Sequence, residues 1–244
     1  MAQPARFGNP PCLRAKPNSC ELCPMTWFEP RDIYCERLDA GFWAEPLNAL
    51  SNAAFIVAGL LLLAQWRQSP RTLSGLLLTL NVLVIGLGSF LFHTFANRWS
   101  ELADVLPITI FIHLYFLLAL RHFLKFRWWI AAAATVALFA ATPLIGQALL
   151  PIMGGSAFYA PALMAIFGVA LAASTTDRAV SSSLFITGCL FAVSIALRAA
   201  DQPFCDNLPF GTHMLWHTLN ALVLYRLVRL YLLTSKAGPG LSPG

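Results

Sequence analysis

Histidines, a serine and an aspartate stand at the ends of three apolar stretches of this sequence. In "THMLWH", His213 and His217 are four residues apart, so on a helix both imidazoles would project from one face. In "SFLFHTF", His93 comes one helical turn after Ser89, and "ELADVLP" carries Asp104 at the start of another stretch. Three imidazoles that leave a fourth position to water are a typical ligand set for catalytic zinc. We therefore predict that the three histidines bind zinc and that Ser89 and Asp104 complete the site.

Other interpretations of these residues stay open. The His-x3-His spacing is weak evidence for a metal when taken alone, because a helical histidine often has only a structural role. A polar cluster at the membrane interface, with Trp99 and Trp216 in an aromatic belt, would also account for it. A bis-histidine haem fits the pair but explains neither the serine nor the aspartate. We assign His113 to helix packing and His122 to a basic surface loop, both outside the site.

A second cluster consists of the carboxylates in "DIYCERLDAGFWAEPLN". Asp32, Glu36, Asp39 and Glu45 supply oxygen atoms immediately before an apolar stretch. Calcium is a hard cation that takes six to eight oxygen ligands, so this density of acids predicts a calcium site, although the spacing is not that of an EF-hand. The alternative is acidity that suits a helix N-terminus, together with ordinary surface charge.

The composition indicates which elements must position these residues. Of the 244 residues, 58% are hydrophobic and only 11% are charged, which is too few charges to cover a soluble globule of this size. Several stretches reach the roughly 20 residues that cross about 30 Å of hydrocarbon as a helix. We predict an all-α membrane protein, a seven-transmembrane helix bundle. The spans are expected at residues 46–66, 73–95, 101–120, 128–146, 155–173, 180–200 and 211–234.

The chain is expected to form one membrane domain with a tail at each end. No apolar segment of the signal-peptide type follows the first basic residues, so residues 1–45 are expected to form a structured tail. Residues 46–234 make up the helix bundle. Residues 235–244 are rich in Gly and Pro and are expected to be disordered.

The basic residues predict how the bundle is oriented, because cytoplasmic loops retain positive charge. Lys and Arg are concentrated after the first, third and fifth spans and at the C-terminal end, whereas the opposite loops hold only Arg98 and Arg198. We therefore expect the N-terminus outside, the C-terminus in the cytoplasm and the active site on the extracytoplasmic side. The excess Lys and Arg that give the net charge of +5 are then expected to lie at the membrane surface. Nothing indicates a groove that binds nucleic acid.

The cysteines agree with this orientation, because disulfides persist in oxidising compartments. Five of the six lie on the side predicted to be outside, and Cys189 lies within a span. A metal knuckle is the alternative for "CELC", but no second Cys/His pair is near it. The sequence does not determine the pairing; Cys35 with Cys205 is our first choice, because it ties the tail to the loop before the last helix. The others on that side are Cys12, Cys20 and Cys23.

Five motifs, "YCE", "FWAEPLNALSN", "SFLFH", "ELADVLP" and "HMLWH", resemble in this order the motifs of the alkaline ceramidase family, seven-helix hydrolases related to the adiponectin receptors. The resemblance spans essentially the whole chain and is greatest to the bacterial branch. It implies a multi-pass protein of the bacterial inner membrane that cleaves the N-acyl bond of ceramide-like lipids into a sphingoid base and a fatty acid. It also implies zinc binding by His93, His213 and His217, with Ser89 and Asp104 in the site.

The same resemblance implies calcium binding by the acidic tail. Glu36 and Glu45 match family ligands, while Asp32 and Asp39 each lie one residue away from a ligand position. The family's bridge between tail and loop matches the cysteine pairing preferred above.

The chemistry of amide hydrolysis explains the predicted zinc site. An amide is a poor electrophile with a poor leaving group, and zinc lowers the pKa of bound water from 15.7 to roughly 7. Asp104 is expected to accept the proton and pass it to the leaving amine, as general base and then acid. Ser89 is expected to donate a hydrogen bond to the oxyanion. A serine nucleophile is less favoured, because histidines bound to zinc cannot serve as its base.

Two other functions remain possible at this stage. A seven-helix zinc-containing lipid sensor or receptor, similar to the adiponectin receptors, would share the fold and the metal. A zinc-stabilised scaffold would hold a coordinatively saturated metal. In the hydrolase, the lipid amide substrate is expected to enter laterally from the membrane, with its acyl chains between apolar helices. The oligomeric state is not predictable from the sequence.

Overall fold

The helices begin and end at residues suited to these positions. In the computed structural model, which describes residues 26–235, the Thr72 hydroxyl accepts a hydrogen bond from the Gly75 amide at the start of α3. Asn97 and Ser100 form a capping box at the start of α4. The Asp177 carboxylate accepts from the first amides of α7. Local sequence therefore determines where these three helices begin.

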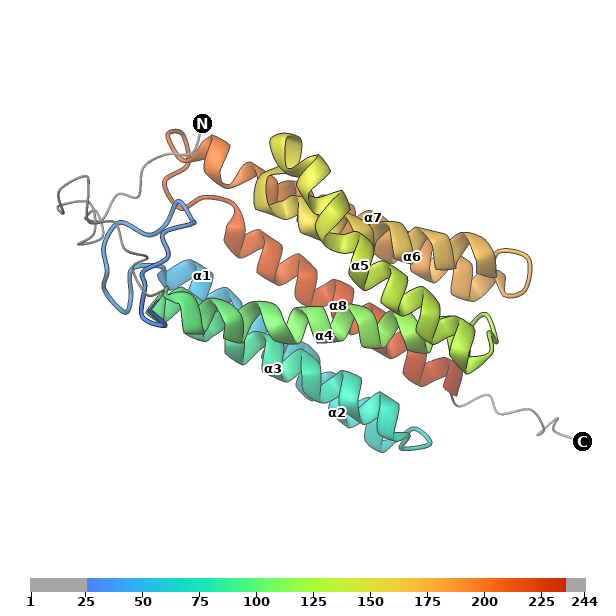
Figure 1. The fold of residues 1–244 in the computed structure, drawn as a ribbon. Coiled ribbons are helices and arrows are strands. Elements are labelled where there is room, and N and C mark those ends of the chain that lie inside the picture. The colour runs from blue at the N-terminus through green and yellow to red at the C-terminus, as the bar shows by residue number, and fades with distance from the viewer. Residues whose placement is uncertain (1–25, 236–244) are drawn as a thin grey trace, which may run out of the picture.

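The described part of the chain is mostly helical (Figure 1). An isolated β-bridge joins Pro30 to Asn97. Short 3-10 helices lie at Gly154–Tyr159 (η2) and Gln202–Phe204 (η3). The α-helices are α1 (Pro46–Ser51), α2 (Ala53–Arg67), α3 (Leu73–Phe95), α4 (Arg98–His122), α5 (Trp128–Met153), α6 (Ala160–Ala173), α7 (Arg178–Ala200) and α8 (His213–Ser235).

The predicted all-α class is confirmed, and several predicted boundaries shift. The first span is interrupted at Asn52, which separates α1 from α2. The fourth continues through Pro143 and Pro151 as α5, and the fifth is preceded by η2, so that α6 begins only at Ala160. Gly154, with φ +54°, allows the sharp change of direction between α5 and η2 that Figure 1 shows.

Five helical segments of the described chain are long and apolar enough to cross a membrane: Pro46–Arg67, Leu73–Phe95, Arg98–His122, Trp128–Ala173 and Arg178–Ala200. The segment Trp128–Ala173 contains both α5 and α6, which run in opposite directions in Figure 1. The more polar α8 is not among the five, and it packs against α1, α2, α3 and α7. Seven spans therefore stay a prediction, whereas several membrane-length apolar helices are found.

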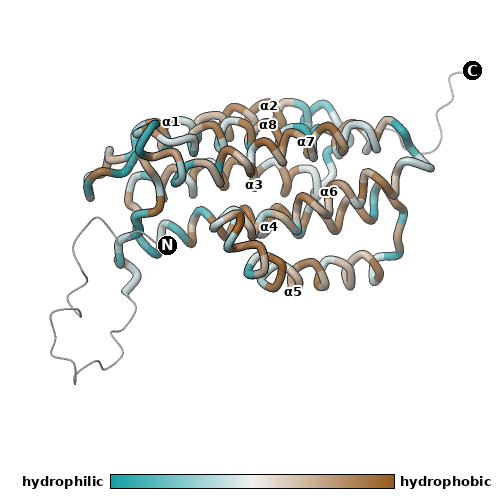
Figure 2. Tube along the Cα trace, turned by 90° about the horizontal axis from the view of Figure 1, so that it is seen from above, coloured by the Kyte–Doolittle hydropathy of each residue, from teal (hydrophilic) through white to brown (hydrophobic). Residues whose placement is uncertain are grey.

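Hydrophobic residues extend along the lengths of the helices, and hydrophilic residues lie mainly toward the two ends of the bundle (Figure 2). Large apolar side chains such as Leu144, Ile152 and Leu171 are more than 70% exposed, which suits a surface that faces lipid. The interior is also apolar, with Leu62, Leu78 and Val228 fully buried. An apolar exterior together with an apolar interior indicates an integral membrane protein.

One end of the bundle carries the N-terminal segment, the turn between α3 and α4, and the loop between α7 and α8 (Figure 1). Glycine brings α3 and α4 into close contact near this end: a Cβ atom on Gly88 would lie only 2.1 Å from the Ala103 carbonyl oxygen. Because Ser89 follows Gly88 and Asp104 follows Ala103, this contact also brings those two side chains together.

Candidate metal centre and active site

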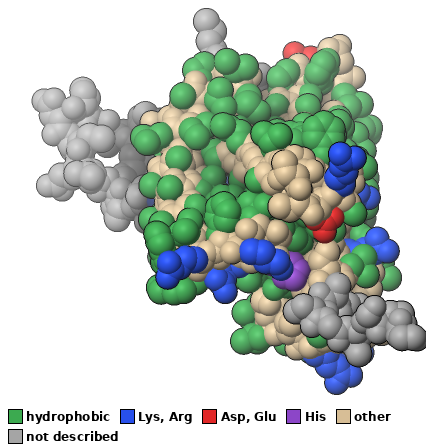
Figure 3. All heavy atoms as spheres, turned by 90° about the vertical axis from the view of Figure 1, so that its right-hand side faces the viewer, with side chains coloured by type: hydrophobic (Ala, Val, Ile, Leu, Met, Phe, Trp, Pro, Cys, Tyr) green, Lys and Arg blue, Asp and Glu red, His purple; other side chains and the backbone are tan. Residues whose placement is uncertain are grey.

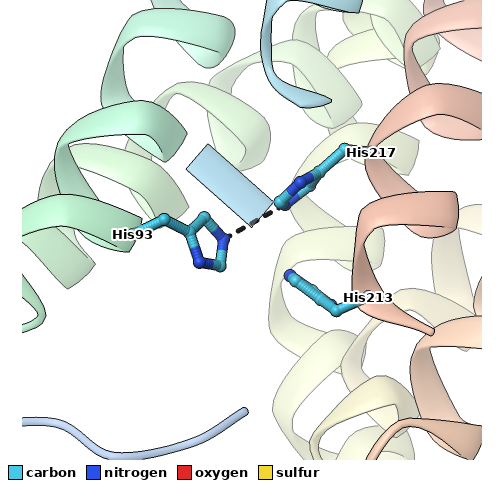
Figure 4. A group of neighbouring side chains, drawn as sticks. All are labelled: His93, His213 and His217. Atoms are coloured by element: carbon cyan, nitrogen blue, oxygen red, sulfur yellow. Dashed lines mark hydrogen bonds between the residues drawn. The ribbon is translucent and has the colours of Figure 1, made fainter. Parts of the chain in front are cut away.

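Three histidines from two helices meet at this end of the bundle. His93 comes from the last turn of α3, and His213 and His217 come from the first two turns of α8 (Figure 4). One ring nitrogen from each lies within 4.8 Å of the others, and all three residues are at most 2% exposed. Among residues 26–235, this is the only cluster of three or more His, Cys, Asp or Glu side chains with ligand atoms this close. The structure thus brings together the three histidines predicted to bind zinc.

Hydrogen bonds determine which nitrogen of His93 faces the centre. Its Nδ1 lies 2.6 Å from Oε2 of Glu45. Burial alone would raise the pKa of Glu45, but the hydrogen bond with His93 and the charge of Arg37 outweigh it and hold that pKa below its ordinary value. An ionised carboxylate only accepts hydrogen bonds, so Nδ1 of His93 carries a proton, and in the neutral ring the lone pair is then on Nε2.

The same argument applies to His217. The Ser51 hydroxyl donates its single proton to the Asn48 carbonyl oxygen at 2.8 Å, so it accepts from Nδ1 of His217 at 2.7 Å. The neutral ring then carries its lone pair on Nε2. Figure 4 shows this nitrogen directed toward His93, and the two Nε2 atoms are 3.1 Å apart. When both rings are neutral these two lone pairs face each other, and a cation bound between them would satisfy both.

The spacing of these nitrogens fits zinc. Two nitrogens that are each roughly 2.0–2.1 Å from a tetrahedral zinc ion lie about 3.3 Å from one another. The third ring, that of His213, has a buried Nδ1 without a hydrogen-bond partner in the described chain. The donor set therefore fits a zinc ion.

His213 is held by groups from the N-terminal segment and the α7–α8 loop. Its ring stacks on Tyr34 with the ring centroids 3.7 Å apart. Its backbone amide donates to Oδ1 of Asp201 at 2.9 Å, and Oδ2 of the same carboxylate accepts from the Cys35 amide. Cys35 and Cys205 are joined by a disulfide. Cys12, Cys20 and Cys23 lie outside the described residues.

Ser89 and Asp104 lie beside the three histidines. The Ser89 hydroxyl is 3.4 Å from Nε2 of His217. The Asp104 side chain lies within hydrogen-bonding reach of Ser89 and close to His93. Its Oδ1 is buried, with no hydrogen-bond partner among residues 26–235. A hydroxyl and a carboxylate oxygen are thus available to a substrate or a water molecule next to the imidazoles.

The predicted calcium ligands take other roles. The Glu36 oxygens accept from the Leu47 and Asn48 amides at 2.7 and 2.8 Å, so this side chain satisfies the start of α1. Burial raises the pKa of Glu36, and these two hydrogen bonds only partly oppose the increase. Oδ1 of Asp39, an exposed residue, accepts from the amide of Gly41.

The four acids therefore do not converge on one cation. Asp32 does not join Glu36, Asp39 and Glu45 in a ligand cluster within the described chain. Both oxygens of Glu45 are engaged, Oε1 by Arg37 and Oε2 by His93 and Asn48. The residues present do not fit a calcium ion at the predicted place.

The sequence reasoning did not assign Tyr34, Ser51, Asp201 or Arg198 to the site. Arg198 on α7 donates to the Ser156 and Tyr34 hydroxyls at 3.0 and 3.2 Å, and its guanidinium lies over the rings of Tyr159 and Trp216. An arginine within the apolar stretch "SIALRAA" was the available signal. Tyr34 and Ser51 stand within the motifs "YCE" and "FWAEPLNALSN", and Asp201 follows an apolar stretch, but no spacing singles out these three residues from their neighbours.

The other two histidines lie outside the site, as predicted. His113 on α4 is involved in packing: its Nδ1 is 2.7 Å from the Thr109 carbonyl oxygen and its ring contacts Phe139. His122 contacts Thr234 at the opposite end of the bundle.

Two apolar hollows lie among the helices. One lies between α4 and α5 and is lined by Glu101, Phe139 and Arg198, among others. The second lies inside the bundle, where Phe111 of α4 and Leu227 of α8 line it. Both are walled by residues of α4, η2 and α6, namely Ile108, Ile112, Tyr159 and Ala162. Apolar side chains thus line a hollow at the outer face of the helices and another in the interior, separated by this shared wall.

The family model described as Ceramidase matches residues 34–238. This range contains all the described helices and every side chain of the centre, from Tyr34 to His217. No curated protein matches the chain.

Proposed function

The chain belongs to the ceramidase family, whose members hydrolyse amide bonds, and from this premise we propose that it is a zinc-dependent membrane amidase. The bond cleaved is the N-acyl bond of a ceramide-like lipid, and the products are a sphingoid base and a fatty acid. The observation that carries the proposal is the buried group of His93, His213 and His217, in which the Nε2 atoms of His93 and His217 are 3.1 Å apart.

The residues that hold the metal are His93, His213 and His217. A zinc ion there would polarise both a water molecule and the amide carbonyl. The protein contributes the orientation of the ligands: Glu45 and Ser51 hold the rings of His93 and His217 in the tautomers that bind through Nε2.

Asp104 and Ser89 act on the substrate. The free Oδ1 of Asp104 accepts a proton from the attacking water and later delivers it to the amide nitrogen, which must be protonated to leave. The Ser89 hydroxyl donates a hydrogen bond to the carbonyl oxygen as negative charge develops on it. The position of Ser89 between His217 and Asp104 supports this assignment.

The apolar hollows suit a substrate with long acyl chains. The lipid enters from the membrane between α4 and α5, and its chains extend into the interior hollow next to Tyr115 and Phe191. Glu101 and Arg198 at the polar end of the outer hollow lie where a headgroup would be. Water is kept from most of this path by apolar side chains, which favours a lipid over a soluble amide.

We place the site on the extracytoplasmic side of a seven-span bundle. The opposite end carries the loops after α2, α4 and α6, and Figure 3 shows Lys and Arg side chains around it. At the end that holds the site, arginines face acids instead: Arg31 contacts Glu101 and Arg37 contacts Glu45. The unbalanced positive charge of the far end favours the cytoplasm for that end.

The test is fatty-acid release from a panel of N-acyl lipids by the purified protein, with zinc measured on the same sample and His217→Ala as the control. Release by a protein that holds about one zinc, lost in the variant, supports the amidase. Bound zinc without release from any lipid would contradict it and favour a sensor.

A further inference from the structure

Arg37 lies buried in the middle of the acidic segment. Its side chain is 4% exposed, and its guanidinium donates hydrogen bonds to four oxygen atoms. Nε donates to Oε1 of Glu45 at 2.5 Å, and the first terminal nitrogen donates to the carbonyl oxygens of Asp39 at 3.2 Å and Gly41 at 3.5 Å. The second terminal nitrogen donates to the carbonyl oxygen of His93 at 3.0 Å.

Hard metal cations in proteins are bound by carboxylate and carbonyl oxygens, and Arg37 is surrounded by one carboxylate and three carbonyl oxygens of this kind. Here the planar guanidinium, with its five N–H donors, occupies that place. A divalent cation inside the same cage would lie within a few ångströms of the guanidinium, and repulsion between the two charges is strong in a buried site. These four oxygen atoms can therefore bind either a divalent cation or the guanidinium, and in this structure they bind Arg37.

Arg37 also holds His93 from two sides. One terminal nitrogen binds the main-chain carbonyl of His93, and Nε binds the carboxylate whose other oxygen accepts from the imidazole. Tyr34, three residues earlier, stacks on His213. The N-terminal segment is thereby joined to rings of both α3 and α8.

We infer that Arg37 is a built-in cation that takes the place predicted for calcium, so that the protein positions His93 without calcium. Arg37 is a positioning residue, since it acts on the metal centre through Glu45 and the His93 carbonyl. The inference adds a regulatory property, calcium independence, to the proposed zinc site, but its first test does not depend on zinc or turnover.

The first experiment follows thermal unfolding of the full-length wild-type protein in detergent, with and without millimolar calcium chloride, and measures the calcium that copurifies. A calcium site of micromolar affinity would raise the unfolding temperature by several degrees, because ligand binding to the folded state stabilises it. We expect no shift and no stoichiometric calcium. A clear rise in unfolding temperature, or about one calcium per chain, would overturn the inference whether or not the protein is an amidase.

The second experiment compares Arg37→Ala and Arg37→Lys with Arg31→Ala, which removes the partly exposed partner of Glu101 in the same segment. Arg37→Ala should lower the unfolding temperature well below that of Arg31→Ala, and millimolar guanidinium or calcium ions should restore part of the loss. Arg37→Lys should be intermediate, because an ammonium retains the charge but not the planar set of donors.

A readout of the metal centre separates positioning from general stability. In cobalt-substituted protein, the visible absorption bands should change in Arg37→Ala, stay near those of wild type in Arg31→Ala, and return toward wild type with guanidinium. If Arg37→Ala folds and keeps the wild-type spectrum, Arg37 does not position His93. If the alanine variant does not fold, Arg37→Lys provides the same comparison.

Discussion

Oε2 of Glu45 lies 2.6 Å from Nδ1 of His93, although the two residues are 48 positions apart in the chain. This contact makes Glu45 an orienting group for a predicted zinc ligand instead of a ligand for a separate calcium ion. The acidic segment and the histidine cluster are consequently parts of one site, joined by a single carboxylate.

Glu45→Gln should weaken metal binding while the three histidines remain. The amide loses the charge that fixes the tautomer of His93, and removal of such a partner typically costs about 10–100-fold in metal affinity. Zinc competition with a chromogenic chelator measures the change. Glu29→Gln, which alters a carboxylate 3.7 Å from Arg98 near the surface, is the control and should bind zinc like wild type. Equal zinc affinities of the two variants would show that Glu45 does not orient His93.

Asp104→Asn should abolish most turnover while zinc stays bound. The variant keeps the shape of the side chain but cannot accept a proton, and general acid–base catalysis contributes typically about 10²–10⁴-fold. Fatty-acid release per bound zinc is the measurement. Asp206→Asn, the same change at an exposed residue of the loop before α8, is the matched control and should retain turnover. An Asp104→Asn protein of near-normal rate would show that the proton is carried by another group.

Ser89→Ala should lower kcat more than it raises KM, because its hydrogen bond is strongest when charge develops on the carbonyl oxygen. Loss of one such donor costs about 10²–10³-fold in kcat. Ser194→Ala removes another buried serine hydroxyl, one that donates to the Trp216 carbonyl at 3.3 Å, and should leave kcat near wild type. A rise in KM alone would assign Ser89 to substrate binding.

Gly88→Ala should separate α3 from α4 at the site. The added methyl would lie 2.1 Å from the Ala103 carbonyl oxygen, and such overpacking costs typically about 1–3 kcal/mol. Gly168→Ala in α6 is the control, since nothing lies within 4 Å of its Cβ position, and it should be neutral or slightly stabilising. Thermal unfolding in detergent compares them. Equal stability of the two variants would mean that the α3–α4 contact is not tight.

Cys35→Ser should destabilise the site end of the bundle. The disulfide with Cys205 closes a loop of 170 residues, and loss of a native disulfide costs typically about 2–5 kcal/mol. Zinc retention should fall as well, because Asp201 and Cys35 together support the start of α8. Cys189→Ser, at the exposed free cysteine, should change neither property. A Cys35→Ser protein as stable as Cys189→Ser would contradict this role.

The sequence alone was sufficient for features that depend on neighbouring residues. The four-residue spacing of His213 and His217 puts them on one helical face wherever that helix packs, and the apolar stretches are helical because an unpaired backbone is costly in hydrocarbon. The α-helical structure follows from such local patterns. So does the position of His93, Ser89 and Asp104 near helix ends on one side of the membrane.

Tertiary structure decided which groups these residues meet. The four acids look the same in the sequence whether they surround a calcium ion or the side chain of Arg37. Only the tertiary structure places the guanidinium between Glu45 and the His93 carbonyl. Ser51 reaches His217 across 166 positions in the same way. Residue type and spacing determine what each side chain can donate or accept. Partners far apart in the chain are selected by packing, which buries apolar surface while it satisfies most buried polar groups.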